Sequence, residues 1–146
     1  MSDLHVGARA DPSLGRALAQ IVAIVDPELI VATGDLTNRG RADQHATAAA
    51  LLRGLGPPVV AVPGNHDIPY TFPARFTTPW LEFERQWQTP EPEHAGAGVH
   101  VVGLNSVRPW RHQSGVVSDA QLERVTAKLR RAAPGALRVV ALHHQM

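Results

Sequence analysis

Four short segments of this 146-residue chain carry the residue types that bind metal ions and move protons. They are Ser2-Asp3-Leu4-His5, Gly34-Asp35-Leu36-Thr37-Asn38, Gly64-Asn65-His66-Asp67 and Leu142-His143-His144. The chain contains eight histidines and no cysteine, so any metal ion must be held by oxygen and nitrogen ligands. Carboxylate, amide and imidazole groups of this kind suit borderline metals such as Mn, Fe or Zn.

Taken one at a time, the segments differ in how strongly they indicate a site. An Asp-x-His pair such as Asp3 and His5 arises often by chance, and Gly34-Asp35 after an apolar run is also an ordinary turn signal. The tetrapeptide Gly64-Asn65-His66-Asp67 is the sharpest signal, because average residue usage makes it rare. His143 alone could be a buried histidine satisfied by backbone, but its occurrence together with the other segments favours a metal ligand.

The elements that must position these residues can be predicted from apolar runs and helix signals. Apolar, β-prone runs predict strands at 29–32, 59–62, 99–104 and 139–142. Helical spacing predicts helices at 12–25 after Asp11, at 43–55, around 80–87, and from Ser118 to a stop before Pro134. Apart from its short helix, the stretch 68–98 is expected to be a long loop region.

Two of the predicted helices have a recognisable apolar face. In the first helix, the face is formed by Leu14, Leu18, Ile21, Val22 and Val25. In the last helix, Ser118 and Gln121 predict a capping box, and Leu122, Val125 and Leu129 are expected to face the core.

Strands that alternate with helices predict an α/β layered fold with right-handed crossovers. In such folds the loops at the carboxyl ends of the strands gather at one edge, where ligands bind. Asp35, Asn65, Asn105 and His143 each follow a predicted strand. We therefore expect these polar side chains to meet at that edge of the sheet.

In combination, the four segments resemble the signature of the calcineurin-like metallophosphoesterases. Gly103-Leu104-Asn105-Ser106 and the capped helix before the last strand are similar to the branch that contains the class III cyclic-nucleotide phosphodiesterases. The resemblance covers essentially the whole chain. It implies one domain over 1–146, built as a β-sandwich of two sheets flanked by helices, and an enzyme that hydrolyses phosphate esters.

The same resemblance implies two divalent or trivalent metal ions, Mn, Fe or Zn. The implied ligands are Asp3, His5, Asp35, Asn65 and His143. Asp3 and His5 would bind the first ion, Asp35 would bridge both, and Asn65 and His143 would bind the second.

The resemblance also implies catalytic roles for His66 and Asp67. A hydroxide that bridges two cations about 3.5–4 Å apart attacks phosphorus in line. His66 would face the substrate and donate a proton to the leaving oxygen, with its ring oriented by Asp67.

Several further side chains lie in loops that would flank this site. Arg39, Arg108, Arg111, His112 and His144 could hold a phosphate oxygen or a base edge. For the arginines and His112, ordinary solvated loop charge is an equally good interpretation.

The chain departs from the family pattern at both ends. It has no Gly-His-x-His element, whose histidines complete both metal shells in the family, and only Met1 and Ser2 precede Asp3. We therefore expect a partial domain that lacks the C-terminal part of the second sheet, with weakened metal affinity.

Composition limits the partners. Fourteen Lys and Arg residues against thirteen Asp and Glu residues form no basic stripe, so nucleic-acid binding is not expected. No apolar stretch reaches the roughly 18 residues of a membrane span, and the N-terminus lacks a signal-peptide pattern. We expect a cytoplasmic protein that acts on a small phosphate ester, and the sequence does not indicate its oligomeric state.

The leading functional hypothesis is a phosphodiesterase that acts on a small substrate such as a cyclic nucleotide. A phosphomonoesterase or a pyrophosphatase on the same site remains open, because the regions that select substrate are ambiguous. A catalytically dead metal-binding or interaction fragment is the alternative from a different class.

Overall fold

The structure is a computed structural model that describes residues 1–8, 12–96, 98–111 and 113–145. Asp11 and the candidate site residue His112 lie outside the described residues. In chain order the elements are α1 (Pro12–Val25), β1 (Ile30–Thr33), α2 (Ala42–Arg53), β2 (Val59–Val62), α3 (Ala74–Thr77), α4 (Leu81–Trp87), β3 (Glu93–Gly96), β4 (Val99–Gly103), α5 (Asp119–Leu129) and β5 (Leu137–Ala141).

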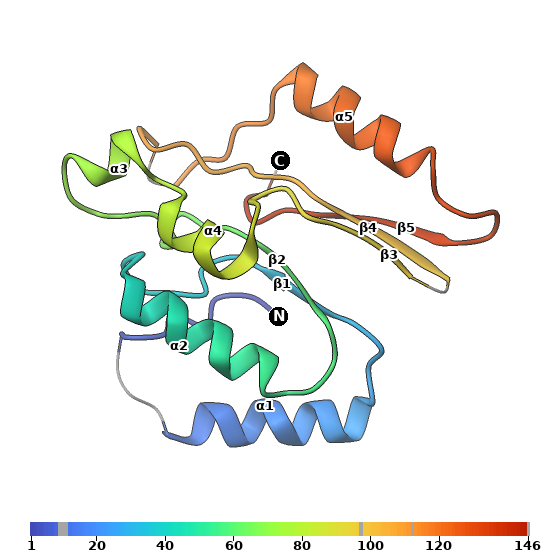
Figure 1. Cartoon of the computed structure of the whole chain (residues 1–146), viewed down its shortest axis with the longest axis horizontal. Coiled ribbons are helices and arrows are strands. Elements are labelled where there is room, and N and C mark those ends of the chain that lie inside the picture. The colour runs from blue at the N-terminus through green and yellow to red at the C-terminus, as the bar shows by residue number, and fades with distance from the viewer. Residues whose placement is uncertain (9–11, 97, 112, 146) are drawn as a thin grey trace.

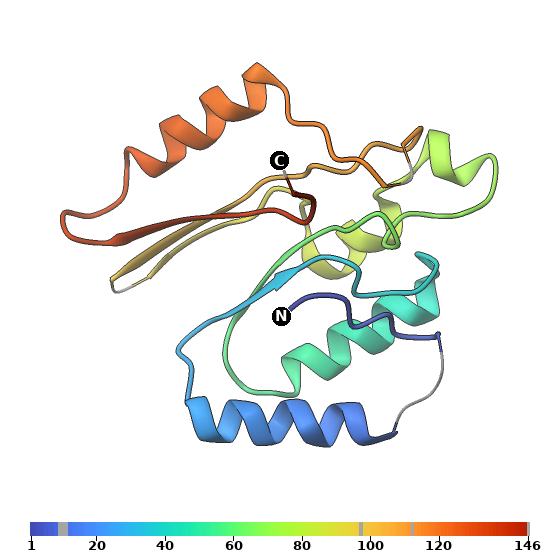
Figure 2. The ribbon, with the colours of Figure 1, turned by 180° about the vertical axis from the view of Figure 1, so that it is seen from behind.

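The strands form two small sheets. In the first, β1 and β2 run parallel, with Ile30 opposite Val59. In the second, β4 lies between β3, which is antiparallel to it, and β5, which is parallel. Figure 1 shows α1 and α2 outside the first sheet and α5 outside the second, and Figure 2 shows the same layers from behind. The predicted α/β layered fold is confirmed.

The apolar core lies in two places. Between the sheets, Val60, Val62, Val101 and Ala141 pack together. A second cluster lies beneath α2 and α4, where Leu36, Leu52 and Phe83 are fully buried among small alanines. Burial of these apolar side chains stabilises the fold on which the loops after β1 and β2 are held.

The predicted stretch of loop between 68 and 98 is wrong in part, because it contains α3 and β3. The sequence Glu93–Gly96 has no β-branched residue and gives no strand signal of its own. Its strand state comes from pairing with β4, and Glu93 forms ion pairs with Lys128 in the last turn of α5 and with Arg131 just after it. Tertiary context therefore decides this element.

The predicted apolar faces of two helices need correction. In α1, Leu18 is 8% exposed, but Ile21 and Val25 are 52% and 64% exposed. In α5, Leu122 is 49% exposed whereas the polar Gln121 is buried. The capping box predicted at Ser118 is present, and the Gln121 side chain also donates to Glu91 and to the Asn105 carbonyl, at 2.6 and 2.8 Å.

These inward hydrogen bonds explain why Gln121 rather than Leu122 faces the sheet. Within the described part of the chain, none of the helices combines the length and the apolar character needed to cross a membrane.

Candidate metal centre

The N-terminal residues run alongside the loop that follows β1. The amide of Asp3 donates to the Gly34 carbonyl at 3.1 Å, and the amide of His5 donates to the Asp35 carbonyl at 3.0 Å. A bridge between Val6 and Thr37 continues this pairing. The two segments therefore deliver their side chains to the same place, although they are separated by α1 in the chain.

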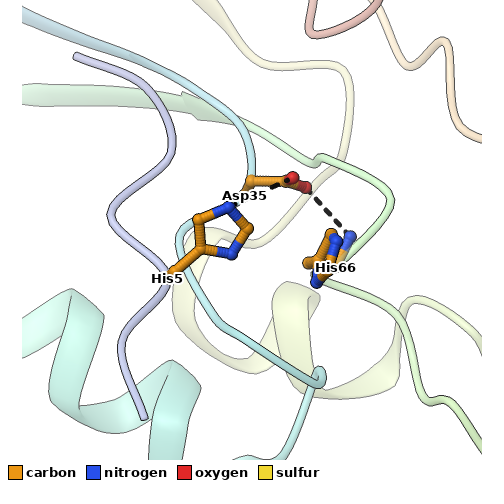
Figure 3. Close-up of side chains that lie close together, drawn as sticks. All are labelled: His5, Asp35 and His66. Carbon is orange, nitrogen blue, oxygen red and sulfur yellow. Dashed lines mark hydrogen bonds and ion pairs between the residues drawn. The ribbon is translucent and has the colours of Figure 1, made fainter. Parts of the chain in front are cut away.

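Three of the candidate ligands adopt a left-handed backbone conformation. The φ angles of Asp3, His5 and Asp35 are 58°, 45° and 52°. A positive φ is uncommon for residues other than glycine, and such strain persists where the surrounding structure requires a particular side-chain direction. In this backbone conformation, the side chains of His5 and Asp35 point toward each other (Figure 3).

Two glycines allow the loops after β1 and β2 to touch. A Cβ atom on Gly64 would lie 2.1 Å from Asp35 Oδ1 and 2.2 Å from the Asp35 amide nitrogen. A Cβ on Gly34, whose φ is +91°, would lie 2.7 Å from both the Gly64 nitrogen and His143 Nδ1. The glycines of both motifs are therefore required by close approach at the site itself.

His5, Asp35 and His66 form the group shown in Figure 3, in which the potential ligand atoms all lie within 4.8 Å of one another. His5 Nε2 lies 3.8 Å from Asp35 Oδ2, and the His66 amide donates to Asp35 Oδ1 at 2.9 Å. The rings of His5 and His66 meet edge to face with centroids 4.7 Å apart.

A second group of acceptors lies on the other side of the Asp35 carboxylate. His143 Nδ1 lies 2.8 Å from the Thr33 carbonyl oxygen, which can only accept, so Nδ1 carries the proton. In the neutral ring, Nε2 then carries a lone pair, and it lies 3.4 Å from Asp35 Oδ1 and 3.3 Å from Asn65 Oδ1. His143 Nε2 and the two oxygens thus converge, and either a second proton on His143 or a cation between them would satisfy all three.

Such convergence is unfavourable unless a proton or a cation lies among the three atoms, because each is an acceptor. A backbone carbonyl that fixes the Nδ1 proton of a ligating histidine is the usual outer-shell contact of a metal site. The carboxylate, imidazole and amide oxygen donors therefore fit a borderline cation.

Asp3 lies at the outer side of this group. Its Oδ1 is 3.7 Å from His5 Nε2, its side chain is 57% exposed, and its other oxygen contacts the Ser2 hydroxyl. The structure thus brings Asp3, His5, Asp35, Asn65, His66 and His143 together around one carboxylate.

Asp67 has a different position from the one expected of it. Its buried carboxylate accepts hydrogen bonds from the amides of Gly64, Leu36 and Thr37 at 2.8, 3.2 and 2.8 Å. Burial raises the pKa of Asp67, and these amide donors, together with the charge of nearby His45, act in the opposite direction. The carboxylate also accepts from the Thr37 hydroxyl at 3.0 Å, so it joins the two ligand-bearing loops and its hydrogen bonds are with these groups rather than with the His66 ring.

The His66 ring contacts two groups that sequence reasoning missed. Its Nδ1 lies 2.9 Å from the Asn38 carbonyl oxygen and 2.8 Å from the Tyr70 hydroxyl. A backbone carbonyl leaves no trace in residue type, and Tyr70 lies in the stretch expected to be loop. Only its spacing of four residues from His66 could have suggested a contact.

The basic residues of the flanking loops differ in where they point. The Arg108 guanidinium donates to the Asn105 and Val107 carbonyls and to Gln121 Oε1 at 3.2, 2.8 and 2.6 Å, which ties α5 to the loop after β4. Arg39 is exposed and lines a hollow beside Asn38. Arg111 is exposed and contacts the Ser114 hydroxyl. Of these three arginines, Arg39 is the one that directly follows Asn38, whose carbonyl contacts the His66 ring.

His144 packs directly against the candidate metal ligand His143. Its ring centroid is 4.9 Å from that of His143, and its Nδ1 lies 2.9 Å from the Ser106 hydroxyl. Burial lowers the pKa of His144, a positive charge on a protonated His143 would lower it further, and Asp35 acts in the opposite direction. A mainly neutral imidazole is therefore favoured beside His143.

The chain matches the calcineurin-like phosphoesterase family over residues 1–144, and it belongs to this family. It is 29% identical over 157 aligned positions to a probable cyclic nucleotide phosphodiesterase of Rhodococcus erythropolis, covering 99% of this chain and 50% of that relative. It is 38% identical over 72 positions to a probable cyclic nucleotide phosphodiesterase of Moraxella catarrhalis, covering 47% of this chain and 26% of that protein.

The chain thus spans half the length of the Rhodococcus relative, and its match covers about a quarter of the Moraxella relative. Among solved structures, a dimetal phosphatase from Danio rerio has a similar fold, with a TM-score of 0.61 at 15% identity, over 98% of this chain and 68% of that one. The resemblance read from the four motifs is confirmed at the level of family and fold.

Proposed function

We propose that this chain carries the metal centre of a hydrolase that acts on phosphate esters, with a small phosphodiester such as a cyclic nucleotide as substrate. The observation that carries the proposal is the convergence of His143 Nε2, Asn65 Oδ1 and Asp35 Oδ1, with His5 on the opposite side of the same carboxylate. One buried carboxylate between two sets of nitrogen and oxygen donors suits a pair of cations.

In this proposal, Asp3 and His5 would hold one ion, Asn65 and His143 would hold another, and Asp35 would be available to both. When bound, the two ions would supply Lewis-acid activation of water and of the phosphoryl oxygens. Mn, Fe and Zn all match the donor set. The residues of this chain supply the fixed positions: the amides bound to Asp67 hold the loops, and the Thr33 carbonyl fixes the proton of His143.

His66 is the proposed general acid for the departing alcohol. Its Nδ1 proton is held by the Asn38 carbonyl, which leaves Nε2 as the nitrogen that exchanges a proton with the substrate. Arg39, His112 and His144 remain candidates for contacts with the phosphate or the leaving group. Arg108 is a weaker candidate, because its guanidinium is already bound to the Asn105 carbonyl and to Gln121.

The preference for a diester is supported by the similarity to the two probable cyclic nucleotide phosphodiesterases of Rhodococcus and Moraxella. A phosphomonoesterase or a pyrophosphatase would use the same ligands. We also propose that the chain has no nucleic-acid partner, on its near-neutral charge balance. A cytoplasmic location is part of the same proposal.

Hydrolysis of bis-p-nitrophenyl phosphate and of p-nitrophenyl phosphate, measured with and without added Mn²⁺, tests the proposal. We expect Mn²⁺-dependent release of p-nitrophenol, faster from the diester, and its loss in the Asp35→Asn variant. The partly buried His94 on β3 offers the matched control His94→Gln, which should keep full activity. Hydrolysis that persists in Asp35→Asn, or that needs no metal, would contradict the proposal.

A further inference from the structure

Tyr70 makes a close contact with the proposed general acid. Its hydroxyl oxygen lies 2.8 Å from His66 Nδ1 and 3.3 Å from His66 Nε2, so it is near both ring nitrogens and closer to Nδ1. The two ring centroids are 5.5 Å apart.

The chemistry of Asn38 determines what this contact can do. The Asn38 carbonyl oxygen, 2.9 Å from His66 Nδ1, is an acceptor only, so Nδ1 must carry a hydrogen. The Tyr70 oxygen can then share that Nδ1 hydrogen as a second acceptor. The Asn38 carbonyl fixes the tautomer, and a second acceptor on the same proton restricts the orientation of the ring. Nε2, at the longer distance of 3.3 Å from the Tyr70 oxygen, is then the nitrogen that exchanges a proton.

The face of the Tyr70 ring in turn packs against the Arg75 guanidinium. The Arg75 side chain is buried, at 4% exposure, and its guanidinium carbon lies 5.9 Å from the centroid of the Tyr70 ring. Its Nε donates to the Pro109 carbonyl at 2.6 Å, and its Nη1 donates to the Pro69 carbonyl at 3.1 Å. A cation at this distance from an aromatic face attracts the ring. Arg75 therefore fixes the loop that carries Tyr70 against the loop that carries Pro109.

We propose that Tyr70 is a positioning residue for His66, and that it keeps the His66 ring in the orientation in which Nε2 serves the leaving group. The leaving-group role rests on the proposed function, whereas the positioning of the ring stands on the contacts alone. Tyr70 acts through His66 and is not itself placed on the reacting atoms.

The kinetic test uses the Tyr70→Phe variant, which removes only the hydroxyl, on two methyl aryl phosphodiesters. General-acid help matters more for a less acidic leaving group. We expect kcat for phenyl methyl phosphate to fall by about tenfold and kcat for p-nitrophenyl methyl phosphate to fall by less than about twofold, out of the 10²–10⁴-fold that a general acid contributes. KM should stay unchanged for both. An equal loss on both substrates would indicate general structural damage and overturn the inference.

A double-mutant cycle shows whether Tyr70 acts through His66. In the His66→Ala background, Tyr70→Phe should have no further effect on phenyl methyl phosphate. An undiminished tenfold effect there would contradict a role through His66. Phe76→Leu is the control, because it changes an exposed aromatic residue of the same stretch without touching His66.

A spectroscopic test does not depend on activity. The ¹⁵N chemical shifts of the His66 ring should report a protonated Nδ1 in both proteins, but the Nδ1 shift should change in Tyr70→Phe, because the Nδ1 proton keeps the Asn38 carbonyl and loses its second acceptor. Identical ring shifts in both proteins would overturn the inference even if hydrolysis is observed. If the wild-type chain hydrolyses no ester, the proposed function fails, and this measurement still decides the positioning role.

Discussion

His143 donates its Nδ1 hydrogen to the Thr33 carbonyl oxygen at 2.8 Å, across 110 residues of chain. This one contact links the end of β5 to the end of β1, and it sets which nitrogen of His143 faces Asp35 and Asn65. A backbone carbonyl in the first sheet thereby determines the chemistry of a side chain that follows the second. The predictions below test what depends on this arrangement.

Removal of the His143 imidazole should weaken metal binding. Its Nε2 is one of the three acceptors around the proposed position of the cation, so His143→Ala should lower Mn²⁺ affinity by at least the 10–100-fold typical of lost outer-shell contacts. Isothermal titration with Mn²⁺ measures the change. His100→Gln, at a buried histidine that contacts Glu93 on the second sheet, should leave Mn²⁺ affinity unaltered. Equal affinities for wild type and His143→Ala would exclude His143 as a ligand.

A methyl group at Gly64 should disrupt the centre. In Gly64→Ala, the new Cβ would lie 2.1 Å from Asp35 Oδ1, so either the carboxylate or the loop must move. We expect a loss of about 1–3 kcal/mol in the free energy of unfolding, as for other overpacked sites, together with loss of Mn²⁺ binding. Urea denaturation measures the first effect.

The matched control for Gly64 is Gly15→Ala in α1. There the new Cβ would meet only a flexible Leu51 methyl group, at 3.3 Å. Its effect on stability should be small, since alanine also favours the helix. If Gly64→Ala were as stable and as active as the Gly15→Ala protein, the close approach of the two loops would be refuted.

Asp67→Asn should destabilise the protein without removing a metal ligand. The carboxylate accepts hydrogen bonds from the amides of Leu36, Thr37 and Gly64, and the amide group of asparagine would direct donors toward donors. An unsatisfied buried polar group costs about 1–3 kcal/mol. Glu123→Gln, on the exposed side of α5, removes a charge of the same sign and should leave the unfolding midpoint unchanged. A stable Asp67→Asn protein would show that these bonds contribute little.

The sequence was informative where one local signal decides the structure. The helix Pro12–Val25 and the strand Val59–Val62 were both predictable from apolar spacing and flanking prolines. Strand β3 was not, because Glu93–Gly96 becomes a strand only through its pairing with β4. The exposed Leu122 shows the same limit, since Gln121 is drawn inward by Glu91 and the Asn105 carbonyl.

The site divides in the same way. The residue types of Asp35, Asn65 and His66 marked them as candidate site residues, and the structure places them close together. The contacts that orient them were not predictable, because the Thr33 and Asn38 carbonyls are invisible in residue type. Tyr70 was missed because its relation to His66 depends on the path of a loop.

The corrected face of α1 gives a stability prediction. Leu18 is 8% exposed and Ile24 is 83% exposed, although both are large aliphatic residues of one helix. Leu18→Ala should reduce the free energy of unfolding by about 2–5 kcal/mol through lost burial and a residual cavity. Ile24→Ala should change it by less than about 0.5 kcal/mol. Urea unfolding that ranks the two variants in the reverse order would contradict the described packing.

The contacts of Glu91 predict a loss of stability in acid. Burial alone would raise the pKa of Glu91, but hydrogen bonds from Gln121 and Arg124 outweigh it, so its pKa in the folded protein lies below the reference value of 4.5. A carboxyl group with a lowered pKa adds stability above its unfolded pKa and loses it as the pH falls through the folded pKa. The difference in unfolding free energy between wild type and Glu91→Gln should therefore shrink below about pH 4. A difference that is independent of pH from 7 to 3 would refute this role.

The most direct test of the metal centre is a Mn²⁺ titration of the wild-type chain and the Asp35→Asn variant, followed by the electron paramagnetic resonance signal of free Mn²⁺. Asp35 contacts His5 on one side and His143 on the other, so a single substitution affects both halves of the centre. We predict that the wild-type chain binds Mn²⁺ and that Asp35→Asn loses at least tenfold in affinity, about 1.4 kcal/mol. Equal binding by the two proteins, or no binding by the wild-type chain, would contradict the assignment of this cluster as a metal centre.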